Sequence, residues 1–142
     1  MSSDPNKKVK VLFTCLDWRL HPQVEEFFTK DGVACDMCIT AGSVKDLIDP
    51  LTREFFLKQI DISKRLHNCQ AVILTMHMDC GAYGGSKAYD GLDAEIAGCT
   101  DELKKTKAIV EERFPGLPVE TYIIDLEHAQ NGWNIAPEAV EI

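Results

Sequence analysis

The stretch Val9-Lys10-Val11-Leu12-Phe13-Thr14-Cys15-Leu16-Asp17-Trp18-Arg19 decides the fold. Its apolar first half has the composition of a buried strand, and its second half places a cysteine, an aspartate and an arginine two residues apart. A second uncharged run, residues 71–75, is rich in β-branched residues and is followed by His77-Met78-Asp79-Cys80-Gly81. We therefore expect both motifs to lie just beyond the ends of buried strands.

The remaining pattern alternates between strands and helices. Strands are expected over residues 9–14, 34–40, 71–75 and 119–124. Helices are expected from Pro22 to about residue 30, from Asp49-Pro50 onward, and from about Thr100 to the residue before Pro115. This order predicts one α/β domain over residues 1–142, with a central, mostly parallel four-stranded sheet flanked by helices. The tail from Asp125 is left unassigned.

Both motifs fall where ligands bind in such sheets, at the carboxyl ends of the strands. The formal net charge of −8 argues against nucleic-acid binding, which needs a clustered basic surface. There is no apolar segment of transmembrane or signal-peptide type, so we expect a cytoplasmic protein with no membrane partner. In that reducing compartment the six cysteines are not expected to form a disulfide framework.

Cys15, His77 and Cys80 are the predicted metal ligands. His77 and Cys80 have the short spacing of a metal-binding pair, and glycines at positions 81, 84 and 85 let the chain turn around them. Two thiolates, one imidazole and an open fourth position suit Zn²⁺, which lowers the pKa of bound water toward neutrality.

Asp17 and Arg19 are the predicted catalytic pair. If the backbone stays extended past Thr14, both side chains point to the same side as Cys15, and Arg19 holds Asp17 ionised. Asp17 either accepts a hydrogen bond from water on the metal or fills the fourth position itself, and the sequence leaves both arrangements open. The non-functional alternative is that Asp17 and Arg19 form an ordinary salt bridge in a loop and that Cys15 is simply a buried apolar residue.

Other motifs are weaker. A phosphatase loop needs cysteine and arginine six residues apart, whereas Cys15 and Arg19 are four apart. Cys35 and Cys38 have redox-motif spacing but fall within a strand, where an offset of three puts them on opposite faces. Cys69 and Cys99 are expected to be structural. Asp79 and Tyr83 either line the site or only hydrogen-bond its loop.

The two motifs resemble those of the β-class carbonic anhydrases, which carry C-x-D-x-R after the first strand and H-x-x-C-G after the third. Ala41-Gly42 resembles the family's turn after the second strand, and the likeness spans roughly residues 9–85. The resemblance implies that Cys15, His77 and Cys80 bind zinc, and that Asp17 and Arg19 gate and orient zinc-bound hydroxide. It also implies reversible hydration of carbon dioxide to bicarbonate by a homodimer or higher homo-oligomer, with active sites near the subunit interface.

The sequence departs from the family inside and beside these motifs. Leu16 and Trp18 replace small residues, and Ile39-Thr40 replaces an Arg-Asn pair. Two alternatives therefore stand beside carbon dioxide hydration. One is a zinc hydrolase of carbonyl sulfide or carbon disulfide, and the other is a non-catalytic zinc-binding protein on the same fold.

Overall fold

Five strands pair into a single sheet in the computed structural model, which describes residues 4–142. Met1–Ser3, which belong to the N-terminal stretch of residues 1–10 that is expected to carry no signal peptide, lie outside the described residues. The strands are β1 (Val9–Cys15), β2 (Ala34–Thr40), β3 (Ala71–His77), β4 (Val119–Ala129) and β5 (Gly132–Ala139). Their order in the sheet is β2-β1-β3-β4-β5; the first four are parallel, and β5 runs antiparallel to β4.

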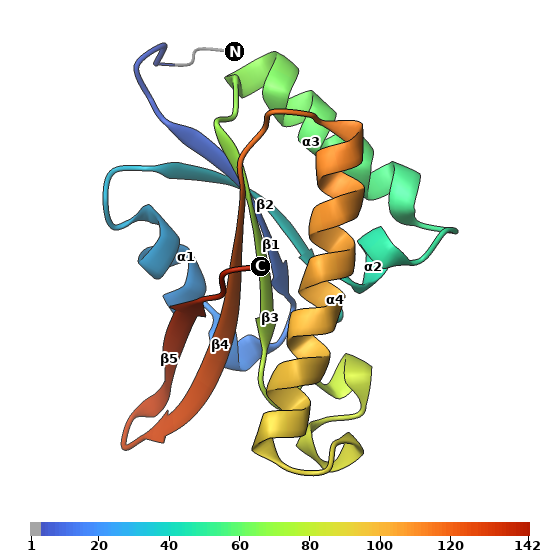
Figure 1. Cartoon of the computed structure of the whole chain (residues 1–142). Coiled ribbons are helices and arrows are strands. Elements are labelled where there is room, and N and C mark those ends of the chain that lie inside the picture. Colours follow the sequence, from blue (N-terminus) through green and yellow to red (C-terminus); the bar gives the residue numbers. More distant parts are fainter. Residues whose placement is uncertain (1–3) are drawn as a thin grey trace.

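Helices cover both faces of the sheet (Figure 1). One face carries α2 (Lys45–Ile48), α3 (Arg53–His67) and α4 (Leu92–Arg113), and the other carries α1 (Gln23–Thr29). Three short 3₁₀ turns are also found within residues 4–142: η1 (Trp18–Leu20), η2 (Gly81–Tyr83) and η3 (Ser86–Ala88). All three turns follow the carboxyl ends of β1 and β3, where the sequence placed its motifs.

Two apolar clusters, one on each face of the sheet, hold β1 and β3 in place. On one face Phe13 and Leu74 pack with Leu57 of α3 and Leu103 of α4. On the other, Leu12 and Ile73 pack with Val24 of α1. Every residue of β3 is buried, as expected for a central parallel strand covered on both faces. The strand ends that carry the motifs therefore extend from the best-packed part of the molecule.

The predicted α/β class and mostly parallel sheet are confirmed, but the count of four strands is wrong. The unassigned tail continues β4 to Ala129, turns, and returns as β5. Pro137 lies in β5, which is tolerated because β5 is an edge strand with one unpaired side.

Two helix starts also differ from expectation. Asp49 is not the N-cap of a helix but the C-cap of α2; its Oδ1 accepts a hydrogen bond from the Leu51 amide, and α3 begins only at Arg53. α4 begins at Leu92 rather than near Thr100, directly after Gly91, whose φ is +92°. Within residues 4–142, no helix is long and apolar enough to cross a membrane.

Candidate metal centre

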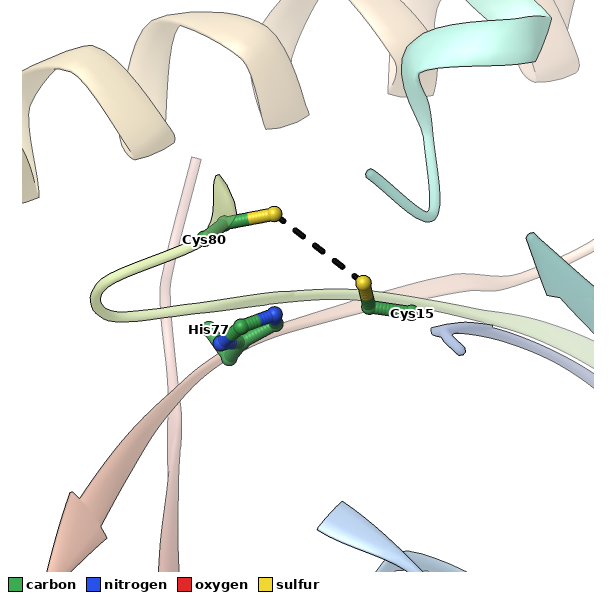
Figure 2. Close-up of side chains that lie close together, drawn as sticks. All are labelled: Cys15, His77 and Cys80. Carbon is green, nitrogen blue, oxygen red and sulfur yellow. Dashed lines mark hydrogen bonds between the residues drawn. The ribbon is translucent and has the colours of Figure 1, made fainter. Parts of the chain in front are cut away.

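Cys15, His77 and Cys80 converge because β1 and β3 are neighbours that end at the same edge of the sheet. Cys15 and His77 are the last residues of these strands, and Cys80 follows three residues later. Their ligand atoms all lie within 4.8 Å of one another, and all three residues are buried. Figure 2 shows the three side chains directed toward a common space. The structure therefore brings the three predicted ligands together, and their binding of a metal stays a prediction.

The orientation of His77 suits a metal ligand. Its Nδ1 lies 2.8 Å from the Met78 carbonyl oxygen, which only accepts, so Nδ1 carries the proton. The lone pair is then on Nε2, which is buried and has no hydrogen-bond partner among the described residues. A buried nitrogen without a partner is costly, and a metal ion would satisfy it.

The two sulfurs are spaced as a shared ion requires. Cys15 Sγ and Cys80 Sγ are 4.0 Å apart, against about 3.8 Å expected between two sulfurs of a tetrahedral zinc site. The hydrogen bond from Cys80 lowers the pKa of Cys15 well below its usual range, and the same bond raises the pKa of Cys80. The Gly42 amide donates to Cys15 Sγ at 3.4 Å and further favours the thiolate. The cluster therefore fits a metal ion.

Asp17 and Arg19 form the predicted pair, although the backbone reaches it differently. The chain stays in β1 only to Cys15 and then turns into η1, and Asp17 caps that turn by accepting from the Arg19 amide at 3.0 Å. Arg19 Nη2 lies 2.6 Å from Asp17 Oδ2, and Nε lies 3.1 Å from both carboxylate oxygens. These bonds from Arg19 lower the pKa of Asp17. Asp17 Oδ2 also lies 3.8 Å from His77 Nε2, so the pair borders the cluster.

Asp79, whose role the sequence left open, binds Arg19 rather than the cluster. Its Oδ2 accepts from Arg19 Nη1 at 3.2 Å, and its Oδ1 accepts from the Ser86 amide at 2.9 Å. Its φ is +58°, an unfavourable backbone conformation for a non-glycine residue. Tyr83 instead donates its hydroxyl to Glu102, 3.2 Å away, and burial raises its pKa.

Sequence reasoning missed Glu95, which holds the loop after His77. Its carboxylate is buried and accepts from the Asp79 amide at 2.7 Å and from the Ser86 hydroxyl at 2.8 Å.

Sequence reasoning also missed His21. Its two ring nitrogens lie 2.9 Å from the Cys15 carbonyl oxygen and 2.6 Å from Glu25 Oε1. Burial alone would lower the pKa of His21, but these two partners raise it overall. A glutamate in a helix and a histidine before a proline carry no sequence signal for such contacts.

A hollow of about 580 Å³ opens beside the cluster. Trp18 forms part of its wall and is 73% exposed. The lining residues come from the first motif, the turn after β2 and the turn after Cys80: Cys15, Leu16, Asp17, Trp18, Arg19, Ala41, Gly81 and Ala82. The wall is therefore apolar except at the cluster and the Asp17–Arg19 pair.

The other four cysteines lie elsewhere. Cys35 and Cys38 pack on opposite faces of the sheet, as predicted, which excludes a vicinal redox pair in this conformation. Cys69 and Cys99 are buried in the helix-covered core. Burial raises the pKa of all four thiols, to about 11 for Cys38 and Cys99. Thiols of this kind are inert.

Together, the fold and the cluster define an α/β protein with a candidate metal centre at the carboxyl edge of a parallel sheet. Residues 5–130 match the family described as "Putative carbonic anhydrase". Because this match covers most of the chain, the protein belongs to that family.

Two relatives are similar to this chain over most of its length. An uncharacterized protein of Rickettsia bellii (strain RML369-C) is 27% identical over 130 residues, covering 86% of this chain and 79% of the relative. One from Rickettsia conorii (strain ATCC VR-613 / Malish 7) is 25% identical over 130 residues, covering 86% and 70%.

Two solved structures are similar to this chain. One comes from a study of two tetrameric β-carbonic anhydrases of Sordaria macrospora; it matches with a TM-score of 0.52 and 12% sequence identity, and the match covers 95% of this chain and 83% of that chain. The β-carbonic anhydrase CafA of Aspergillus fumigatus gives a TM-score of 0.48 and 14% identity, covering 84% and 71%. The Sordaria match shows that the fold is that of a β-carbonic anhydrase.

Proposed function

We propose that this protein is a zinc-dependent carbonic anhydrase that hydrates carbon dioxide reversibly to bicarbonate. The observation that carries the proposal is the position of the Asp17–Arg19 pair, with Asp17 Oδ2 3.8 Å from the free Nε2 of His77. A zinc ion held by Cys15, His77 and Cys80 would supply hydroxide near neutral pH. The donor set favours zinc over harder cations, which prefer oxygen.

Asp17 would act as a fixed hydrogen-bond acceptor at the open side of the cluster. Arg19 occupies both of its carboxylate oxygens, which favours an ionised side chain held beside the metal rather than bound to it. This arrangement favours a catalytic centre with an open position over a closed, non-catalytic one. The apolar wall formed by Leu16 and Ala82 suits a small, uncharged substrate.

The experiment is a direct measurement of carbon dioxide hydration by stopped flow on protein of known zinc content. Wild type should bind about one zinc per chain and hydrate carbon dioxide far faster than free zinc. Asp17→Asn should keep the zinc and lose at least about a hundredfold in kcat, while Cys15→Ser should lose both zinc and activity. Cys35→Ser, which removes a thiol outside the cluster, is the matched control and should keep both. Zinc-loaded wild type no faster than free zinc would refute the proposal.

A second candidate keeps the same centre but acts on carbonyl sulfide or carbon disulfide. The exposed indole of Trp18 on the pocket wall favours it, because a bulky group there changes the shape of the substrate path. Sulfide release from carbonyl sulfide at a rate well above carbon dioxide turnover would select this function, and no release would exclude it.

We also propose that the protein assembles as a homodimer or higher homo-oligomer. The Sordaria β-carbonic anhydrases with this fold are tetrameric. Leu16, Trp18 and Ile39 are exposed apolar residues in or next to the segments that form the site, where a second copy would cover them. Light scattering should give a mass of at least two chains.

A further inference from the structure

Trp133 of β5 contacts the Arg19 side chain. The Cζ atom of Arg19 lies over the indole ring, 5.3 Å from its centroid. This contact joins two segments 114 positions apart in a chain whose family match ends at residue 130, before β5 begins. The tryptophan is thus outside the part of the chain that defines the family, yet it contacts the candidate catalytic pair.

The indole completes the surroundings of the guanidinium. Arg19 already uses its nitrogens along the edges of the group, with Nε and Nη2 donating to Asp17 and Nη1 donating to Asp79. Such bonds lie in the guanidinium plane and leave its faces uncovered. The faces are weakly hydrated and stack favourably on aromatic rings. Trp133 therefore offers a stabilising contact that the carboxylates cannot provide.

Three further contacts hold Trp133 in place, one to its backbone and two to its indole. Gln23 Nε2 donates to the Trp133 carbonyl oxygen at 3.1 Å and ties β5 to the start of α1. His128, the partner of Trp133 across the β4–β5 ladder, contacts the indole edge-on at a centroid distance of 5.1 Å. Trp18 of η1 contacts the Trp133 indole edge-on, with the two ring centroids 6.4 Å apart. The ring is held from both the hairpin and the loop that follows β1.

We propose that Trp133 is a positioning residue for the candidate catalytic pair: it holds the guanidinium of Arg19, and through it the carboxylate of Asp17, beside the metal cluster. The inference rests on the proposed function only for its kinetic consequence. The positioning itself is a property of the protein with or without zinc.

The test compares Trp133→Phe, which keeps a ring face, with Trp133→Leu, which keeps apolar volume without one. Asn134→Ala is the matched control, because Asn134 is an exposed neighbour on the opposite side of the same strand. The first readout is the Arg19 Nε–H resonance in ¹H–¹⁵N spectra, assigned with Arg19→Lys. Trp133→Leu should shift this resonance and speed its exchange with water, and Trp133→Phe and Asn134→Ala should leave it near its wild-type position.

The second readout is the rate of carbon dioxide hydration at unchanged zinc content. Trp133→Leu should lower kcat/KM about three- to tenfold, the size expected for one cation–π contact, and Trp133→Phe should restore it to within about twofold. In an Arg19→Ala background Trp133→Leu should cause no further loss. An equal loss in that background, or an Arg19 resonance unmoved by Trp133→Leu, would overturn the proposal. If wild type hydrates no carbon dioxide, the proposed function fails while the resonance still decides the role of Trp133.

Discussion

The backbone amide of Gly42 donates a hydrogen bond to the Sγ of Cys15, 3.4 Å away. Gly42 belongs to the turn after β2, and its φ of +81° is one that residues with a side chain rarely adopt. A Cβ added there would lie 3.1 Å from the Cβ atoms of both Ala82 and Lys45. The turn thus brings an amide to the thiolate at a place where only glycine fits.

Gly42→Ala should therefore destabilise the protein by about 1–2 kcal/mol and also weaken zinc binding, because relief of the crowding moves the amide away from Cys15. Gly32→Ala is the matched control: its φ is +78°, but nothing lies within 4 Å of the added Cβ. It should lose stability and keep zinc affinity. Urea unfolding and competition with a chromophoric chelator measure the two effects. Equal zinc affinity in both variants would contradict this account of Gly42.

The sequence predicted the cluster because its signals are local. Each motif directly follows an apolar run, and the parallel sheet brings the two strand ends together regardless of how the rest of the chain packs. The Asp17–Arg19 pair was also found, since its members are two residues apart. The geometry of the pair was not predicted, because we expected an extended strand where Asp17 instead caps η1.

The missed features depend on long-range contacts. The sequence of β5 shows poor alternation of apolar and polar residues and contains Pro137. It can be recognised as a strand only from its pairing with β4. The first turns of α4 were missed because Leu92 and Ile96 are exposed and Gly98 interrupts the helical pattern. Trp133 reaches Arg19 only through the β4–β5 hairpin. No spacing rule connects residues that are brought together in this way.

Acid should destabilise the metal-free protein partly through Asp17. Its pKa is lowered in the folded state, so it contributes stability that is complete above its unfolded pKa of about 3.8 and is lost as pH falls through the lower folded value. Asp17→Asn should therefore be less stable than wild type at pH 6, and the two should converge as the pH approaches 2. Urea unfolding of both proteins across this range tests the sign. A constant difference at all pH values would mean that ionisation of Asp17 does not contribute.

Glu95 should stabilise the loop that carries Cys80. Both of its carboxylate oxygens accept hydrogen bonds, so Glu95→Ala removes both acceptors and leaves the Asp79 amide and the Ser86 hydroxyl without this partner. A loss of about 1–3 kcal/mol in unfolding free energy and faster zinc dissociation should follow. Asp93→Asn, an exposed change in the same helical turn, should have neither effect. If the two variants behave alike, the buried carboxylate does not support the loop.

Removal of zinc should expose one particular thiol, that of Cys15, to alkylation. The lowered pKa of Cys15 makes it a thiolate without metal, so zinc should protect Cys15 and a chelator should release it, whereas the raised pKa of Cys80 keeps that thiol protonated and slow to react. Cys38 and Cys99 have pKa values of about 11, so only about one molecule in a thousand is ionised at pH 8, and both should stay unmodified with or without zinc. Mass spectrometry after brief iodoacetamide treatment identifies the modified sites. Protection by zinc should vanish in His77→Ala, which removes a ligand but leaves all six cysteines. Zinc protection that persists in His77→Ala, or falls on Cys38 or Cys99, would place the metal elsewhere.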